Sequence, residues 1–280
     1  MKTEIEMLQI RKEGSFVERD VVATEIPLTV FLNDTEVATL LTSDYEGKSL
    51  AIGFLFSEGF LRHRDQLSGL FESRERKVVR VYTKDKQEPE ARQGMITAGC
   101  GGGRSYAHYN LEAVQIEPPD DTIRIASETI LSLMRLFQDQ SPLFRETGGV
   151  HSCALADGDR IVLLKEDIGR HSAMDRVLGT CFLEDIPLEG KILLTSGRTS
   201  SEIVFKAGRG KFPILVSRSA PTDLAIQIAK ETGIALVGFA RGTRMNVYSH
   251  SERIQTVPVD AAPPSQTRRT DRSPSGACPQ

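Results

Sequence analysis

Residues 191–217 read KILLTSGRTSSEIVFKAGRGKFPILVS, in which two short apolar runs flank a polar loop and a mixed segment. The first run, Lys191–Thr195, predicts a strand, a helix begins near Ser201, and Ile214–Ser217 predicts the next strand. Two strands joined through a helix form the usual unit of a parallel sheet. We therefore expect an α/β sheet with helices on its faces.

The same alternation continues upstream. Asp157-Gly158-Asp159 is typical of a hairpin turn, and it separates apolar runs at 150–156 and 161–164. A helix is predicted over 171–182. Further upstream, Ser127 is expected to cap an amphipathic helix whose apolar residues recur at helical spacing. These apolar residues are Ile130, Leu133, Met134 and Phe137.

Downstream, Pro221 is expected to open a helix and Gly233 to end it, because proline favours the first helical position and glycine the residue after the last. Strands are predicted at 234–239 and 245–248. The N-terminal part mixes both kinds of element and predicts a smaller α+β portion. Its expected strands are 21–23, 28–32 and 78–82, and its expected helix is 50–58, ended by Gly59.

The chain is therefore divided into an N-terminal α+β portion (1–125), a C-terminal α/β portion (126–254) and a tail (255–280). The tail contains Pro258, Pro263, Pro264, Pro274 and Pro279 among polar residues, which predicts disorder.

The composition argues against two classes of protein, those that bind nucleic acid non-specifically and those that span a membrane. The 280 residues are 39% apolar and 26% charged, and 35 basic residues face 38 acidic ones. This balance argues against non-specific binding of nucleic acid. The longest apolar stretch, near Leu50–Phe56, is too short to span a bilayer, and the charged N-terminus lacks the apolar segment of a signal peptide. We expect a cytoplasmic protein that binds neither nucleic acid nor membrane.

One cysteine has a setting that suggests chemistry. Cys100 lies in Thr97-Ala98-Gly99-Cys100-Gly101-Gly102-Gly103-Arg104, where four glycines allow close approach to the backbone. A cation such as Arg104 favours the thiolate, which is the reactive form. Cys153 and Cys181 lie in apolar contexts and are expected to be buried, and Cys278 lies in the tail.

Three loops combine glycine, arginine and hydroxyl side chains at predicted strand ends: 166–171, 195–202 and 239–244. In an open α/β sheet, ligands bind beyond the carboxyl ends of the strands, where helix N-termini and arginines attract anions. Together the loops fit a large phosphate-bearing ligand such as a nucleotide. Taken singly, such a loop more often reflects ordinary turn chemistry than a ligand site.

Individual polar residues leave alternatives open. His171 fits a general acid or base, or a residue that only packs or caps a helix. Asp175, one turn further on, fits either the same side as His171 or a solvated surface position. His151 fits a pocket residue or a buried core histidine. His250-Ser251-Glu252 matches half of a zinc deaminase site, but no P-C-x-x-C follows, so no resident metal is expected.

At this point the sequence resembles the FdhD/NarQ family, the accessory sulfurtransferases that make formate dehydrogenase active. The matching segments follow the family's order and span roughly Glu18 to Ile254. They are 53–59 (GFLFSEG), 147–151 (TGGVH), 166–171 (EDIGRH) with Ala173 and Asp175, 195–198 (TSGR) with Ser200 and Glu202, 219–222 (SAPT), and 238–248 (GFARGTRMNVY).

The resemblance implies a fold similar to cytidine deaminases, without their zinc. It implies a cysteine persulfide on Cys100, received from a cysteine desulfurase. The sulfur passes to the molybdenum or tungsten bis(molybdopterin guanine dinucleotide) cofactor, a bound client, before that cofactor enters formate dehydrogenase. The family also forms homodimers. Its cofactor-binding segment aligns with Phe239, Ala240, Arg241, Gly242, Thr243 and Arg244.

On this hypothesis Arg104 stabilises the sulfur anion and His171 assists proton movement. Arg198 and Arg170 are the candidate phosphate partners. The chain departs from the family at one position, because Gly103 stands where the family has the second cysteine of a C-x-x-C pair. A chaperone that binds the guanylated cofactor without transferring sulfur is therefore the alternative. A nucleobase deaminase is a third reading, which lacks its zinc ligands.

Overall fold

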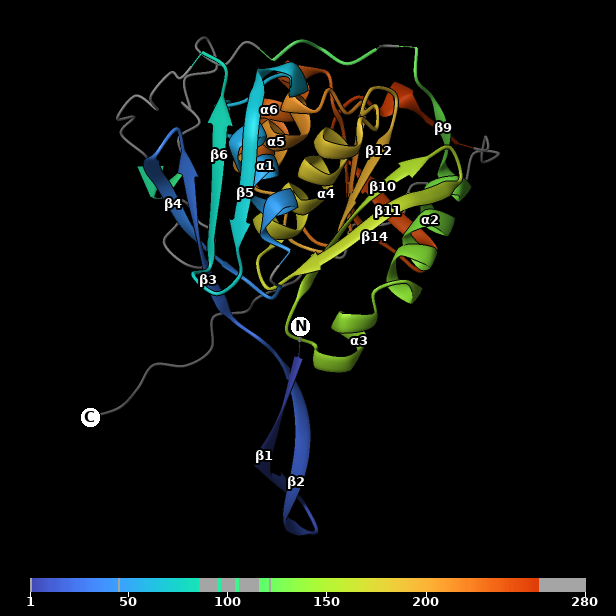
Figure 1. Ribbon diagram of the computed structural model, residues 1–280. Coiled ribbons are helices and arrows are strands. Elements are labelled where there is room, and N and C mark those ends of the chain that lie inside the picture. The colour runs from blue at the N-terminus through green and yellow to red at the C-terminus, as the bar shows by residue number, and fades with distance from the viewer. Residues whose placement is uncertain are drawn as a thin grey trace, which may run out of the picture.

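The computed structural model describes residues 2–44, 46–85, 95–96, 104–105, 116–120 and 122–256 (Figure 1). Its centre is a six-stranded mixed sheet with the order β11-β10-β12-β13-β14-β15. The inner strands β12, β13 and β14 are parallel, and the outer strands join them antiparallel. The bounds are β10 His151–Asp157, β11 Arg160–Asp167, β12 Ile192–Thr195, β13 Ile214–Ser217, β14 Ala235–Arg241 and β15 Arg244–Val247. The predicted α/β sheet is confirmed, while its likeness to cytidine deaminases stays a prediction.

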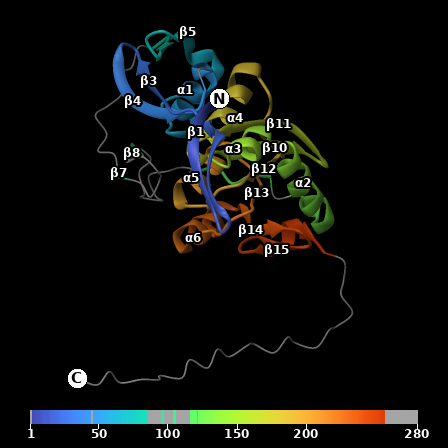
Figure 2. The same ribbon diagram turned by 90° about the horizontal axis from the view of Figure 1, so that it is seen from below.

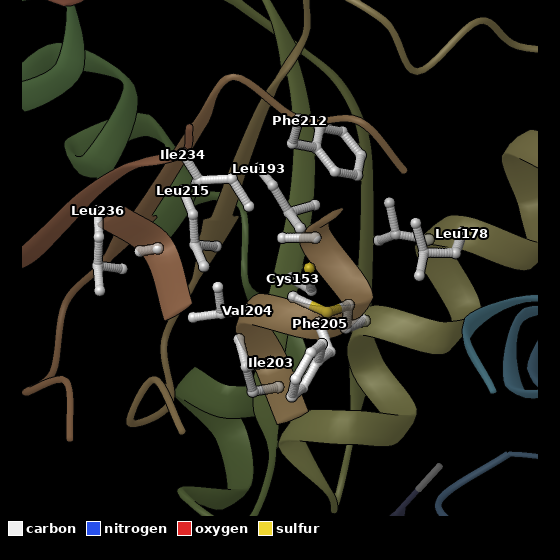
Figure 3. Close-up of a cluster of buried hydrophobic side chains, with 14 of the residues drawn as sticks. Cys153, Leu178, Leu193, Ile203, Val204, Phe205, Phe212, Leu215, Ile234 and Leu236 are labelled. Atoms are coloured by element: carbon white, nitrogen blue, oxygen red, sulfur yellow. The ribbon is translucent and has the colours of Figure 1, made fainter. Parts of the chain in front are cut away.

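Helices cover both faces of this sheet. On one face α4 (Arg170–Glu184), α5 (Ser201–Arg209) and α6 (Asp223–Thr232) enclose a hydrophobic cluster. Figure 3 shows side chains of β12, β13 and β14 meeting those of α5 in this cluster. On the other face α2 (Ser127–Asp139) buries the four apolar residues that its spacing predicts. The central strands are therefore apolar on both sides, as expected of parallel strands between two helical layers.

A second sheet, of four strands, lies beside the first. Its order is β4-β3-β6-β5, with β3 Ile26–Leu32, β4 Thr35–Thr42, β5 Leu67–Ser73 and β6 Val78–Thr83. Helix α1 (Gly47–Ser57) packs on this sheet and also against α4 (Figure 1). The crossing is close because a Cβ on Gly53 would lie 2.8 Å from the backbone nitrogen of Gly179. Gly53 and Gly179 therefore allow α1 and α4 to pack closely, and this helix pair connects the two sheets.

Shorter elements complete the described chain. A long hairpin, β1 (Lys2–Arg11) and β2 (Gly14–Ala23), projects from the body next to α3 (Pro142–Thr147) (Figure 1). Two-residue strands pair β7 (Met95–Ile96) with β8 (Arg104–Ser105) and β9 (Ile125–Ala126) with β16 (Ile254–Gln255). The 3₁₀ turns are η1 (Arg64–Gln66) and η2 (Ser251–Arg253). The tail from Val257 and Cys278 within it lie outside the described residues.

Two predicted helix starts are wrong. Ser127 is the first residue of α2 rather than its cap, which is Ala126, and no side chain caps that end. Pro221 precedes α6 by two residues, because the Thr222 side chain accepts a hydrogen bond from Ala225 N at 3.3 Å and sets the start. Gly233 ends α6 in a left-handed conformation, as predicted. No helix within the described ranges is long and apolar enough to cross a membrane.

Candidate functional site at the carboxyl edge of the sheet

Three helices begin at one edge of the six-stranded sheet. Helix α4 follows β11, α5 follows β12 and α6 follows β13. The edge is common to all three, since His151 at the start of β10 is paired with Asp167 at the end of β11, and Ser196 N donates to Ser152 O. Helix N-termini carry free N–H groups and partial positive charge. This edge is therefore suited to an anionic ligand.

His171 lies in the first turn of α4 and contacts the first turn of α5. Its Nε2 is 2.8 Å from Oε2 of Glu202, which is buried, and Ser200 Oγ donates to the same oxygen at 3.1 Å. The imidazole itself is about a quarter exposed. A carboxylate that fixes one ring nitrogen orients the other, as in many acid–base pairs. The structure thus favours a polar role for His171 over simple packing. Glu202 was already included in the 195–202 loop and in a family-matching segment, but its pairing with His171 was not predicted.

His151 lies among cationic groups of the same edge. Its Nδ1 is 3.2 Å from Ser196 Oγ, and that hydroxyl also accepts from Ser152 N at 3.0 Å. Burial lowers the pKa of His151, and the charges of Arg170, His171 and Arg198 lower it further. The structure therefore brings together the two predicted phosphate partners and both histidines.

Hydroxyl groups hold the loops of this edge to one another. Ser217 Oγ donates to Gly197 O at 2.7 Å, and Ser219 Oγ donates to Ser196 O at 2.9 Å. Gly197 is tightly placed, since a Cβ there would lie 2.8 Å from Cβ of Arg170. The backbone that carries Arg198 is thus fixed against the loop after β13.

The predicted cofactor segment 239–244 extends beyond this edge as the turn between β14 and β15. Phe239 N donates to Ser219 O at 3.0 Å, and Phe239 has a φ of 52°, which L residues rarely adopt. The guanidinium of Arg241 lies 5.9 Å from the centre of the Phe239 ring. Arg241, Thr243 and Arg244 are exposed, whereas Ala240 is buried in the core and can offer a ligand only its main chain.

A buried ion pair links α4 and α5, the two helices that carry His171 and Glu202. Asp175 accepts from Lys206 Nζ at 2.7 and 2.9 Å and from Ser57 Oγ at 2.8 Å, and Glu58 lies 3.4 Å from the same Nζ. Burial lowers the pKa of Lys206, but its two carboxylate neighbours raise it more, so the ammonium is retained. Asp175 is therefore neither solvated nor a partner of His171. Its network joins α1, α4 and α5.

The structure describes residues on either side of the loop that contains Cys100, but not the loop itself. Cys100 and Gly103 fall in residues 97–103, outside the described residues. Ile96 and Arg104 on either side are paired across β7 and β8, and only the main chain of Arg104 is described. The proposed roles of Cys100 and Arg104 stay predictions.

His250 has structural partners, and two of the remaining cysteines are buried. His250 uses both ring nitrogens, on Glu252 Oε1 at 2.9 Å and on Lys230 O at 3.0 Å. Cys153 and Cys181 are buried, and burial raises the pKa of Cys181 to about 12 and that of Cys153 higher still. In the described part of the chain, no group of three His, Cys, Asp or Glu side chains is placed to hold a metal ion.

Comparison with known proteins identifies the family. Residues 23–255 match the model of the FdhD/NarQ family. The chain belongs to the FdhD/NarQ family. The match covers both sheets and every edge loop described above, so the resemblance of the sequence motifs is confirmed.

Two named proteins and one solved structure are among those similar to this chain. The sulfur carrier protein FdhD of Bacillus pumilus is 40% identical over 87% of this chain and 94% of its own length. The protein of that name in Bacillus subtilis is 37% identical, over 84% and 91%. A crystal structure from Desulfotalea psychrophila, described as a candidate formate dehydrogenase accessory protein, superposes with a TM-score of 0.74 at 28% identity, covering 91% of this chain and 99% of that one.

Proposed function

We propose that this chain is a sulfur carrier needed for formate dehydrogenase function. The family match and the names of its relatives support this role. The observation that carries the proposal in the structure is the meeting of Arg170, His171 and Arg198 at one edge with the 239–244 turn. These segments are far apart in the sequence, yet Ser219 joins their loops by hydrogen bonds to Ser196 O and from Phe239 N. Arg170 is buried there, whereas Arg198, Arg241 and Arg244 are exposed.

The client proposed for this surface is the molybdenum or tungsten bis(molybdopterin guanine dinucleotide) cofactor. Its diphosphates are matched by helix N-termini and by the guanidinium groups of Arg170 and Arg198. Its planar guanine is proposed to stack on the Phe239 ring and on the guanidinium of Arg241. The positive φ of Phe239 turns this residue away from the regular strand direction. Thr243 and Arg244 extend the same turn outward.

The sulfur step is proposed for Cys100. Its thiolate attacks the outer sulfur of a cysteine desulfurase persulfide, a new S–S bond forms, and the S–S bond of the donor breaks. The donor leaves as a thiolate, and the transferred sulfur ends the new persulfide on Cys100, so no external oxidant or reductant is required. Arg104 is proposed to favour the thiolate, and His171, oriented by Glu202, to carry the proton.

A second candidate function follows from Gly103. Without a second thiol in the loop, a resolving attack within that loop is impossible. The alternative is a chaperone that holds the guanylated cofactor and docks on the apo-dehydrogenase without transferring sulfur.

Replacement of Cys100 by serine separates the two functions. A sulfur carrier with Cys100→Ser should lose nearly all formate dehydrogenase activation in a strain that lacks its own carrier. A chaperone should retain it. Cys153→Ser serves as a matched control, and its abundance in the cell should be checked because that thiol is buried.

The client surface is tested separately with guanosine diphosphate as the probe. Arg241→Ala and Arg244→Ala should each weaken its binding about tenfold or more, the usual effect of losing a charge-assisted hydrogen bond. Arg76→Ala is the control, since Arg76 is an exposed arginine in the turn between β5 and β6. If all three variants bind guanosine diphosphate with equal affinity in isothermal titration calorimetry, the 239–244 turn is not part of the binding site.

A further inference from the structure

Helices α4 and α5 are joined by two side-chain pairs of opposite polarity. The outer pair is His171 with Glu202, at 2.8 Å, and the inner pair is Asp175 with Lys206, at 2.7 Å. His171 and Asp175 are the second and sixth residues of α4. Glu202 and Lys206 have the same two positions in α5. Residues four apart lie on one face of a helix, so one face of α4 is matched, residue for residue, to one face of α5.

The two helices lie side by side and run in the same direction, because the pairs follow the same order along both. Figure 2 shows both helices on one side of the six-stranded sheet, with α2 on the other. Four helical residues advance by about 6 Å. The outer pair therefore lies at the candidate site, and the inner pair lies about one turn further into the protein.

The inner pair is held rigidly. Asp175 is 3% exposed and Lys206 is 4% exposed. The Lys206 ammonium donates to Asp175 at 2.7 Å and to Ser57 Oγ at 2.6 Å, and Glu58 Oε1 lies 3.4 Å away. Ser57 Oγ in turn donates to Asp175 at 2.8 Å. An ammonium has three N–H donors, so each has an acceptor here and the position of Nζ is fixed from three sides.

The outer pair is held less firmly by its own contacts. The imidazole of His171 is about a quarter exposed, and Ser200 shares the carboxylate oxygen of Glu202 that the imidazole contacts. A partly exposed pair stabilises only weakly, whereas breaking a buried pair leaves an uncompensated charge. The inner pair therefore sets how α4 and α5 are aligned, and the outer pair follows.

The opposite polarity of the two pairs makes this alignment specific. If α5 moved by one turn along α4 in one direction, Glu202 would face Asp175, a second carboxylate. If it moved in the other direction, Lys206 would face His171, and Asp175 would lose its counter-ion. Both alternatives are penalised by charge, which is how a structure excludes a competing arrangement.

Helix α1 fixes the inner pair from a third side. Gly53, Ser57 and Glu58 belong to the family-matching segment 53–59, to which the proposed function gives no role. A Cβ on Gly53 would meet the main-chain carbonyl of Asp175, so α1 packs directly on that residue. Helix α1 ends at Ser57, beside the ammonium of Lys206. The segment thus supports the inner pair.

We infer that Asp175 and Lys206 are positioning residues, which align α4 with α5 so that the His171–Glu202 pair forms at the site. They act through that pair rather than on a ligand. The inference deepens the proposed function, because it rests on the role proposed there for His171.

A double-mutant cycle tests the inference. His171→Ala and Glu202→Ala are made singly and together, and the unfolding constant of each protein is measured in urea. In the wild type the two substitutions should be coupled by a factor of at least about five, as expected for a charge-assisted hydrogen bond. In an Asp175→Leu background the coupling should fall below about twofold.

Asp175→Leu is chosen because it separates α4 from α5 but leaves Lys206 a counter-ion, Glu58. If this background does not fold, Asp175→Asn/Lys206→Met replaces it, since it removes both charges of the inner pair. The same fall in coupling is expected in either background.

Leu133→Ala is the matched control background. Leu133 is buried in α2 on the opposite face of the sheet, so its removal destabilises the protein through a cavity without touching α4 or α5. The coupling between His171 and Glu202 should stay at its wild-type value there. An inner pair that only stabilised the fold would behave in the same way.

Three results would overturn the inference. They are a wild type without coupling, an unchanged coupling in the inner-pair background, and an equal loss of coupling in Leu133→Ala. Since the cycle requires no sulfur transfer, its outcome does not depend on whether the carrier function holds.

Discussion

The substitution Gly53→Ala tests whether α1 and α4 pack as closely as the structure shows. In an isolated helix this change should stabilise by about 1 kcal/mol, since alanine is the better helix former. In this protein the new Cβ would meet the carbonyl of Asp175 and lie 2.8 Å from the nitrogen of Gly179. Real Cβ atoms do not approach other atoms so closely, and both partners are main chain. Helices α1 and α4 must therefore move apart, which disturbs the packing of the side chains between them.

The magnitude follows from these opposing effects. Overpacking of a well-packed core costs about 1–3 kcal/mol and sometimes more, and rigid backbone places this case at the upper end. After the gain in helix propensity, we expect a net loss of about 2 kcal/mol or more in the free energy of unfolding. Urea denaturation followed by circular dichroism measures it as a lower midpoint at unchanged slope.

Gly208→Ala is the matched control, because Gly208 is also helical but the three atoms nearest to its Cβ would all belong to the side chain of Ile116, the nearest at 2.8 Å. A side chain can rotate away, so this variant should lose clearly less stability than Gly53→Ala. A Gly53→Ala protein as stable as the wild type would refute the close crossing of the two helices.

Two further predictions concern buried and clustered charges. Lys206→Met should destabilise the fold by about 3–5 kcal/mol in urea, since Asp175 and Glu58 lose their buried counter-ion, and adding Asp175→Asn should restore part of the loss. A Lys206→Met protein within about 1 kcal/mol of the wild type would contradict this. Burial and neighbouring cations lower the pKa of His151, so this residue favours the folded state less as the pH falls below about 6.5. Arg198→Ala should raise that pKa in an NMR titration, whereas an unchanged or lower value would separate Arg198 from the cluster.

Local pattern was enough to predict most of the central sheet. The hairpin at Asp157-Gly158-Asp159, the apolar face of α2 and the end of α6 at Gly233 were predicted, because turn chemistry and periodicity act over a few residues. The start of α6 was predicted at Pro221, but a hydroxyl cap at Thr222 competes successfully with the proline preference. The short helix α3 and the hairpin of β1 and β2 had no strong periodic pattern, and of these elements only residues 21–23, at the end of β2, were predicted.

The candidate site was predictable only as separate loops. Their convergence follows from the rule that ligands bind at the carboxyl edge of an α/β sheet. The pairing of His171 with Glu202 joins residues 31 positions apart, and the burial of Asp175 depends on Lys206 from another helix. Such contacts are set by the packing of α4 on α5, which sequence spacing does not specify. The 195–202 loop and its family-matching segment included Glu202, but neither indicated that its carboxylate pairs with His171.

The measurement that most directly tests the sulfur-carrier role is intact mass spectrometry after incubation with a cysteine desulfurase and cysteine, followed by peptide mapping. Cys153 and Cys181 are buried thiols, so they should stay unmodified and serve as internal controls. The account predicts a gain of about 32 Da on the Cys100 peptide, reversed by reductant and absent from Cys100→Ser. An unmodified Cys100 peptide, beside a competent carrier that is modified under the same conditions, would contradict it.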